Sequence, residues 1–380
     1  MAIRIVTDRL FGPGPMKGTF AVDVEGGRIA SVSPWDGRGG EEGIFDLRGL
    51  LVSPGLVDIH TQGAEGASTF DGREEAIEAM SEALAKRGVT SFMATTFAVE
   101  EMVRAAARAA RKRLPGARCL GVYLETPFVN PKRRGGILER FIEPPDLSRL
   151  KQILEWAEGM LRFCVVAPEL PGAMEVIRAL VQCGVKPTLG HTDATYEEAV
   201  RGFEAGIRHV THLFNAMRGF HHRDPGPAVA ALERPDVTVE IICDGVHLHP
   251  ATVRLAVKAA GPGRVALITD ASRAAGMPDG VYEYGGKKVV VKGKECRAED
   301  GTLSGSVIFL NEAVRNVQKF AGVSLGEALV MATLTPARAA GVDNSAGRIA
   351  PGYRADIAAF DDGMRCRFCM VGGRVILCEA

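Results

Sequence analysis

Eight short apolar runs, separated by amphipathic segments, constrain most strongly how this 380-residue chain can fold. Runs that are almost continuously apolar are typical of parallel strands covered on both faces. Segments such as 73–87, 196–205 and 250–260 have the pattern of amphipathic helices between them. The runs predict strands at 56–60, 90–96, 120–125, 162–167, 186–191, 209–213, 238–243 and 265–270. Eight βα units predict an α/β fold, a (β/α)8 TIM-like barrel over residues 54–344. A doubly wound open sheet is the alternative, but no Gly-x-Gly-x-x-Gly follows the first strands.

The two ends of the chain have a different texture from the middle. Residues 3–52 consist of short β-like runs divided by glycine pairs, and residues 347–378 repeat this texture. Helical periodicity is absent from the first of these stretches. We therefore expect a small β-sandwich domain assembled from both termini, residues 1–53 plus 345–380.

Composition excludes several classes of function. Lys+Arg and Asp+Glu are balanced at 46 each, so no excess charge favours nucleic acid or a membrane surface as partner. No apolar run is long enough to span a bilayer, and the first residues lack the pattern of a signal peptide. The eight scattered cysteines are typical of buried free thiols in a cytoplasmic protein. Cys366 and Cys369 have zinc-like spacing but no second pair, which favours a structural role.

Four polar residues close predicted strands: Glu125, His191, His212 and Asp270. In a barrel, such residues point into the mouth where active sites lie. Two imidazoles and a carboxylate match the three protein ligands of an open catalytic metal site. Such ligands accept Zn²⁺, Fe²⁺, Co²⁺ or Mn²⁺, and we expect one divalent ion, with zinc favoured. Glu125 taken alone could instead cap a helix. Asp270 would supply the base that hydrolysis at such a metal site needs.

Further histidines and one arginine extend this site. His60 ends the first barrel strand, and the position two residues later, which projects from the same side, holds Gln62. An amide binds metal poorly, so a second ion at His60 and Gln62 would be weakly held. His247 ends another strand and could polarise a substrate carbonyl, whereas His209 could simply open its strand. Arg223 suits phosphate recognition, although a solvated loop arginine is the commoner explanation.

Together these residues resemble the N-acetylglucosamine-6-phosphate deacetylases of the amidohydrolase superfamily, over nearly the whole chain. The most specific runs are Leu-Gly-His-Thr-Asp-Ala-Thr-Tyr at 189–196, Thr-His-Leu-Phe-Asn-Ala-Met at 211–217 and Leu-Ser-Gly-Ser at 303–306. The resemblance implies that Glu125, His191 and His212 hold the metal and that Asp270 is the catalytic acid/base.

The resemblance also implies how substrate is held. His247 would touch the acetamide or the sugar, and Asn215 and Ala216 would lie near the phosphate. Leu303, which opens the last of the three runs, is a further expected substrate contact. The family typically forms homodimers, in which the arginine matching Arg223 would reach into the neighbouring site to bind phosphate.

Three positions depart from the family pattern. Gln62 replaces the second histidine of dinuclear members, and Thr126 stands where a glycine usually follows the metal-binding glutamate. Ile137 takes the place of the histidine in a downstream Gly-x-His. Because that histidine is expected near the sugar, Ile137 affects the identity of the substrate more than the type of reaction.

These observations favour metal-dependent hydrolysis of the acetamide of an N-acetylated amino-sugar 6-phosphate, giving the amino-sugar phosphate and acetate. N-acetylglucosamine 6-phosphate is the expected substrate. The alternatives are an N-acetylgalactosamine 6-phosphate deacetylase, an N-acyl amino-acid deacylase and a catalytically inactive barrel scaffold. The retained cluster of ligands and Asp270 disfavours the scaffold, because buried charges are costly without a function.

Overall fold

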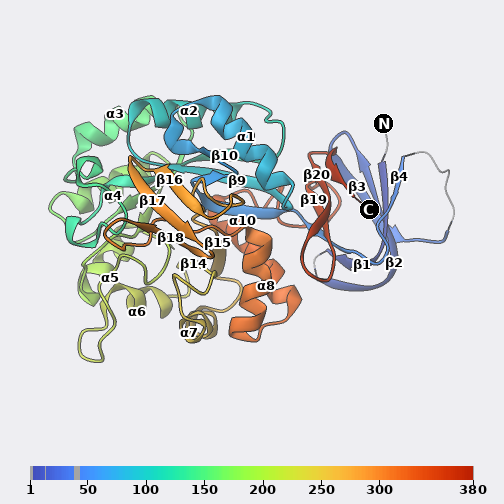
Figure 1. The fold of residues 1–380 in the computed structure, drawn as a ribbon. Coiled ribbons are helices and arrows are strands. Elements are labelled where there is room, and N and C mark those ends of the chain that lie inside the picture. Colours follow the sequence, from blue (N-terminus) through green and yellow to red (C-terminus); the bar gives the residue numbers. More distant parts are fainter. Residues whose placement is uncertain (1–2, 13, 38–42, 380) are drawn as a thin grey trace.

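A computed structural model describes residues 3–12, 14–37 and 43–379, which form two units lying side by side (Figure 1). One unit is a barrel of strands and helices, and the other is a sheet that combines N-terminal and C-terminal strands. Residues 1, 2, 13, 38–42 and 380 of the predicted terminal domain lie outside the described residues.

All eight predicted barrel strands are confirmed, in one sheet of parallel neighbours. The backbone N–H of Asp270 donates to His60 O at 2.8 Å, and that of Gln62 donates to Ala271 O at 3.0 Å. These bonds join the last strand to the first and bring the two edges of the barrel together. The strands are β6 (Leu56–Thr61), β9 (Val89–Thr96), β10 (Arg118–Phe128), β11 (Leu161–Val166), β12 (Lys186–Leu189), β13 (His209–Val210), β14 (Thr238–Ile242) and β15 (Val265–Ile268).

A helix follows each barrel strand, which completes the predicted βα units. The expected helices at 196–205 and 250–260 have those same bounds in the structure, and the one at 73–87 is shorter at both ends. The helices are α1 (Glu74–Ala85), α2 (Glu100–Arg111), α3 (Leu147–Ala157), α4 (Ala173–Gln182), α5 (Tyr196–Ala205), α6 (Gly226–Leu232), α7 (Pro250–Ala260) and α8 (Leu310–Ala321), followed by α9 (Leu325–Ala332) and α10 (Leu334–Ala340).

The second unit is built from both termini, as predicted, and its strands pair in one continuous sheet. The central strand β5 pairs with β1 on one side and with β19 on the other. This ladder joins the N-terminal and C-terminal strands directly, where a sandwich has two separately bonded sheets. The residue boundaries of the two domains stay a prediction. The strands are β1 (Ile3–Phe11), β2 (Pro15–Glu25), β3 (Arg28–Pro34), β4 (Ile44–Asp46), β5 (Leu51–Pro54), β19 (Ile357–Phe360), β20 (Cys366–Val371) and β21 (Arg374–Cys378).

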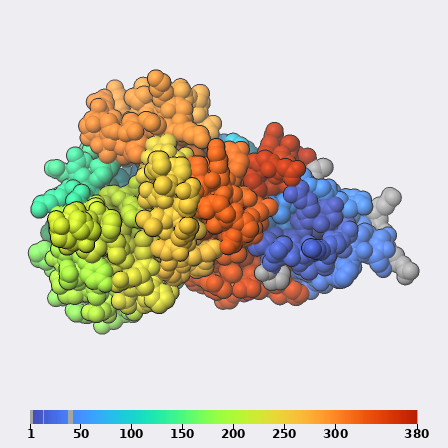
Figure 2. Space-filling model, turned by 90° about the horizontal axis from the view of Figure 1, so that it is seen from below, coloured from blue at the N-terminus to red at the C-terminus, as the bar shows by residue number. Residues whose placement is uncertain are grey.

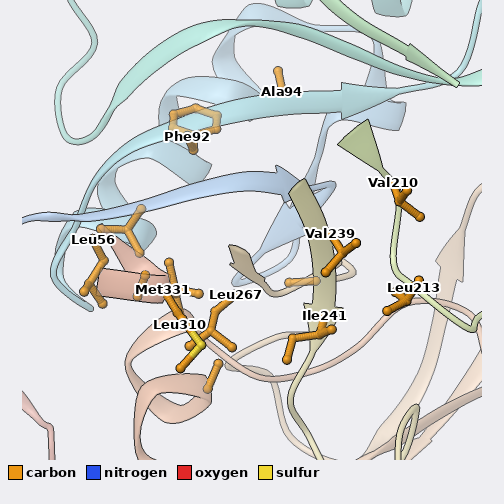
Figure 3. Close-up of a cluster of buried hydrophobic side chains, with 14 of the residues drawn as sticks. Leu56, Phe92, Ala94, Val210, Leu213, Val239, Ile241, Leu267, Leu310 and Met331 are labelled. Atoms are coloured by element: carbon orange, nitrogen blue, oxygen red, sulfur yellow. The ribbon is translucent and has the colours of Figure 1, made fainter. Parts of the chain in front are cut away.

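The main core lies between the barrel strands and their helices (Figure 3). Leu56, Phe92 and Leu267 of the strands are fully buried, and Leu310 and Met331 of the covering helices pack in the same cluster. Burying such side chains contributes roughly 1.5–3 kcal/mol each. This rigid frame is what holds the strand ends, and therefore the polar residues that follow them, in fixed positions.

A small antiparallel sheet lies between β15 and α8 and was not predicted. Its strands are β16 (Gly280–Tyr284), β17 (Lys287–Lys292) and β18 (Glu295–Ala298). In Figure 2 this segment, coloured orange, stands out from the body of the barrel. A short hairpin of β7 (Gly63–Ala64) and β8 (Ala67–Ser68) follows the first barrel strand.

None of the helices in the described ranges is both long and apolar enough to span a bilayer. All eight cysteines are free, but Cys183 and Cys378 are exposed, so the expectation of buried thiols holds for six of them. Cys366 and Cys369 are buried in β20, and burial raises the pKa of the Cys366 thiol to about 12. A thiol that stays protonated is a poor metal ligand, which agrees with a structural role.

Candidate metal and substrate site

Three side chains from three strands, two of them adjacent, converge at one end of the barrel. Glu125 lies within β10, while His191 and His212 follow β12 and β13. The Nε2 atoms of the two histidines are 3.0 Å apart, and they lie 3.1 and 3.4 Å from Glu125 Oε1. Ligand atoms of a tetrahedral site with bonds of about 2.0–2.1 Å lie roughly 3.3–3.4 Å apart. The three residues therefore fit one divalent metal ion.

The backbone turns sharply where these residues leave their strands. His191, His212 and Asp270 have φ angles of 46°, 27° and 47°, in the left-handed region that non-glycine residues rarely adopt. Strain of this kind costs about 1–3 kcal/mol per residue and clusters at functional sites. Gly190, the residue before His191, lets the backbone approach Thr211 closely, because a Cβ at this position would lie only 2.8 Å from Thr211 Cβ.

The hydrogen bonds around the three ligands leave the metal-facing atoms available. His191 Nδ1 lies 2.9 Å from Arg133 O and donates to it, so the lone pair of His191 is on Nε2. Gln62 Nε2 donates to Glu125 Oε2 at 2.6 Å, which leaves Glu125 Oε1 facing the histidines. Burial disfavours the charged form of Glu125, but the nearby imidazoles of His191 and His212 outweigh burial and lower the pKa of the carboxyl.

Asp270 lies beside His60 and close to Glu125. His60 Nε2 is 3.4 Å from Asp270 Oδ1, and both atoms are buried without a hydrogen-bond partner among the described residues. Ligand atoms of His60, Glu125 and Asp270 also lie within 4.8 Å of one another. A second ion position would therefore use Asp270 rather than Gln62, whose amide is already bonded to Glu125.

Glu240 of β14 organises the base of this site and was missed in the sequence. Its side chain is fully buried and accepts hydrogen bonds from His60 Nδ1 at 3.0 Å, His209 Nε2 at 2.8 Å and the His212 backbone N–H at 3.1 Å. Burial opposes its charge, but His60 and His209 hold the pKa of Glu240 well below its ordinary value. The signal was a lone charge inside the apolar run Val-Glu-Ile-Ile at 239–242.

His247 and Asp244 form a second buried pair on the cavity wall. His247 Nδ1 lies 2.6 Å from Asp244 Oδ2, and Asp244 Oδ1 accepts the backbone N–H groups of Val246 and His247 at 2.8 Å. Burial alone would lower the pKa of His247, but the Asp244 carboxylate raises it overall. The pair fixes the ring so that Nδ1 is a donor to Asp244 and Nε2 is free for a substrate.

A cavity of about 410 Å³ opens over the three ligands. It brings together the predicted residues Glu125, His191, His212, Asp270, His247, Asn215, Ala216 and Leu303. It does not include Arg223, which is exposed on the loop before α6 with Nη1 2.8 Å from His222 Nε2. The sequence also missed lining residues from the small sheet and its connections, among them Tyr284, Lys287, Arg297 and Thr302.

Comparison with known proteins places this site in a family. A model of the amidohydrolase family matches residues 51–376. The chain belongs to the amidohydrolase family. It is 38% identical to the N-acetylglucosamine-6-phosphate deacetylase of Bacillus subtilis, over 81% of this chain and 80% of the relative. It is 35% identical to the N-acetylgalactosamine-6-phosphate deacetylase of Escherichia coli O157:H7, over 86% and 87% of the two chains.

Solved structures agree with this assignment. A mutant N-acetyl-D-glucosamine-6-phosphate deacetylase of Mycobacterium smegmatis, in complex with N-acetyl-D-glucosamine-6-phosphate, has a TM-score of 0.93 at 31% identity, covering 99% of each chain. The enzyme of Thermotoga maritima has a TM-score of 0.86 at 32% identity, again covering 99% of each chain. The resemblance found in the sequence, and the expected barrel with a separate sheet domain, are confirmed.

Of the three residues that depart from the family pattern, two line the cavity and the third does not. Gln62 and Ile137 both line the cavity, and Ile137 presents an apolar, 3% exposed side chain. Thr126 is fully buried instead, and its Oγ1 accepts the backbone N–H of Ala98 at 2.9 Å. Gln62 and Ile137 are therefore placed to affect metal and substrate binding, whereas Thr126 supports the packing between β10 and the segment after β9.

Proposed function

We propose that this amidohydrolase removes the acetyl group from N-acetylglucosamine 6-phosphate. The observation that carries the proposal is the meeting of Glu125, His191 and His212 ligand atoms beside the buried carboxylate of Asp270. A divalent cation held there, zinc first and Fe²⁺, Co²⁺ or Mn²⁺ as alternatives, would polarise the acetamide carbonyl and acidify a water molecule. N-acetylgalactosamine 6-phosphate is the second candidate, because a relative of similar identity carries that name.

Asp270 and His247 would carry the proton and the developing negative charge. Asp270 Oδ1 is buried without a hydrogen-bond partner among the described residues, so it is free to accept a proton from the attacking water and pass it to the departing amine. His60 Nε2, 3.4 Å away, keeps that carboxylate in place. Asp244 raises the pKa of His247 and so favours its protonated ring, in which Nδ1 donates to Asp244 and Nε2 would donate to the carbonyl oxygen.

The phosphate end of the substrate would meet cations from two sources. Within the chain, Lys287 and Arg297 line the cavity, and Asn215 and Ala216 lie along it. Arg223 would come from the partner of a homodimer, since its exposed guanidinium lies outside its own cavity. Leu303 and Ile137 would form the apolar part of the sugar pocket.

An amine-release assay on a substrate panel tests this function. The panel contains N-acetylglucosamine and N-acetylgalactosamine, each with and without 6-phosphate, and an N-acetyl amino acid. We expect kcat/KM to be highest for N-acetylglucosamine 6-phosphate and lowest for the unphosphorylated sugars and the amino acid. A preference for the amino acid would favour a deacylase of the same family instead.

The Arg223→Ala variant separates the two sources of phosphate binding. If Arg223 reaches a neighbouring site, the variant raises KM for the phosphorylated sugar at least tenfold and leaves the rate with unphosphorylated sugar unchanged. The matched variant Arg201→Ala removes another exposed arginine, on α5, and serves as control. Light scattering gives the oligomeric state, and a monomer with full phosphate preference would contradict the role of Arg223.

A further inference from the structure

A cleft rich in basic side chains lies far from the active site, where the barrel meets the sheet unit. Its volume is about 350 Å³. The barrel contributes the residues between α2 and β10, and the sheet unit contributes the segment before β19 and the β20–β21 turn. The charged residues that line it are all cationic in the part of the chain that the structure describes: Arg111, Lys112, Arg113, Arg118, Arg354 and Arg374. We refer to these six residues as the basic cleft.

Three of the six charges have a carboxylate partner. Arg111 binds Glu158, Lys112 binds Glu74, and Arg354 Nε lies 3.2 Å from Asp356 Oδ2. These pairs account for half of the positive charge of the basic cleft.

The other three cations, Arg113, Arg118 and Arg374, form no ion pair within the described ranges. Two further carboxylates act on them only at a distance, Asp356 on Arg118 and Glu82 on Arg374. The cleft therefore concentrates positive charge that the surrounding protein does not neutralise.

Two of these guanidinium groups also have buried nitrogen atoms without a hydrogen bond. Arg118 Nε and Nη2 and Arg374 Nε are inaccessible to solvent and have no partner among the described residues. Arg374 Nη2 donates to Leu114 O at 2.7 Å, which fixes its guanidinium across the boundary between the two units. Leaving a buried donor unsatisfied costs about 1–3 kcal/mol, and more for a charged group.

The electrostatics of the basic cleft agree with a missing anion. Burial lowers the pKa of Arg118, and the neighbouring Arg354 lowers it further. Burial likewise lowers the pKa of Arg374, and the neighbouring Arg113 lowers it further. Each of these cations is therefore less stable in the folded protein than in water, and a bound anion would reverse the effect.

We propose that the basic cleft binds a small anion that carries a phosphate group. A phosphate dianion suits several planar guanidinium groups at once, because each can donate two parallel hydrogen bonds to its oxygens. The cleft is a separate site: Arg118 begins β10, and Glu125 lies roughly 23 Å further along that strand at about 3.3 Å per residue. A ligand there would tie the sheet unit to the base of the barrel.

Calorimetric titration with inorganic phosphate at low ionic strength tests the proposal. The wild-type protein is compared with Arg118→Gln/Arg374→Gln, and the control is Arg178→Gln/Arg201→Gln, which removes two exposed arginines of α4 and α5. We expect the cleft variant to raise Kd at least tenfold and the control to leave it within twofold. Equal weakening in both variants would show general charge attraction and overturn the proposal, as would the absence of saturable binding to wild-type protein.

Thermal unfolding provides a second readout that separates binding from folding defects. Without phosphate, the cleft variant should stay close to wild type in stability, because it removes unpaired buried charge together with the bond from Arg374 to Leu114 O. With phosphate, only wild type and the control should gain stability, by linkage. A variant that is less stable without phosphate and keeps the phosphate-induced gain would contradict the site. If this variant does not fold, the exposed Arg113→Gln replaces it in both measurements.

A parallel titration with glucose 6-phosphate identifies the source of the phosphate group. This sugar phosphate has no amide to hydrolyse, and its binding to the catalytic cavity should persist in the cleft variant. The part of its binding that the cleft variant loses belongs to the basic cleft. If glucose 6-phosphate binds the basic cleft more tightly than inorganic phosphate does, the site takes a sugar phosphate. Equal affinities of the two ligands would identify free phosphate.

Discussion

Replacing Glu240 by glutamine should destabilise the protein by about 3–5 kcal/mol, the typical cost of breaking a buried ion pair. Glu240 is fully buried and accepts three hydrogen bonds, of which the His60 and His212 bonds end on Oε2 and the His209 bond ends on Oε1. A glutamine has only one acceptor oxygen, so its NH₂ group must face one of these donors.

The structure indicates which orientation the glutamine would take. The His212 backbone N–H cannot become an acceptor, whereas His209 can move its proton to Nδ1, which has no partner among the described residues. The amide oxygen therefore takes the Oε2 position and the NH₂ group faces His209. The hydrogen bonds survive in this arrangement, and what is lost is the negative charge that stabilises protonated His60.

Urea unfolding, followed by circular dichroism, gives the free energy of unfolding of Glu240→Gln and of wild type. The exposed Glu204→Gln on α5 is the control and should stay within about 0.5 kcal/mol of wild type. Both proteins are also measured after chelation, because displacement of His212 would weaken metal binding and add to the difference. A loss below about 1 kcal/mol in the chelated protein would refute the conclusion that Glu240 and His60 form a buried ion pair.

Three further predictions concern the site itself. Asp270→Asn should abolish amine release while metal content, measured by elemental analysis, stays largely intact; turnover within a few-fold of wild type would contradict its role as acid/base. Treatment with a chelator should abolish activity. Adding back Zn²⁺, Co²⁺ or Mn²⁺ one at a time should restore it and identify the metal. Full activity in the metal-free protein would exclude a metal mechanism. Asp244→Asn should lower the pKa of His247, measured by NMR, because the carboxylate is what raises it. Since that pKa is raised on folding, the pair contributes fully below the ordinary histidine pKa of about 6.5 and loses its contribution as pH rises through the folded value. The destabilisation by Asp244→Asn should thus be larger near pH 6 than near pH 9, and an equal loss at both would contradict the pairing.

Sequence reasoning reached the site because barrel geometry makes strand ends converge. Glu125, His191 and His212 stand at the ends of separate apolar runs, and the parallel arrangement brings them to one mouth. Buried residues that hold the site histidines in place were harder to find from the sequence. Glu240 is flanked by apolar residues of its own strand, so only its contacts with His60 and His209 reveal its purpose.

The local pattern of the chain by itself determined the order and type of its elements, since apolar runs and amphipathic periods follow from residues close in sequence. It also indicated the ligand types, since imidazole and carboxylate at strand ends suit a metal. Only the tertiary structure decided how Gln62 is used, because its bond to Glu125 joins β10 to the residue after β6. The tertiary structure likewise decided which residues form the basic cleft, because its cations come from segments more than two hundred residues apart. Contacts between such distant segments depend on how the barrel closes and on how the two units pack, and no local pattern encodes either.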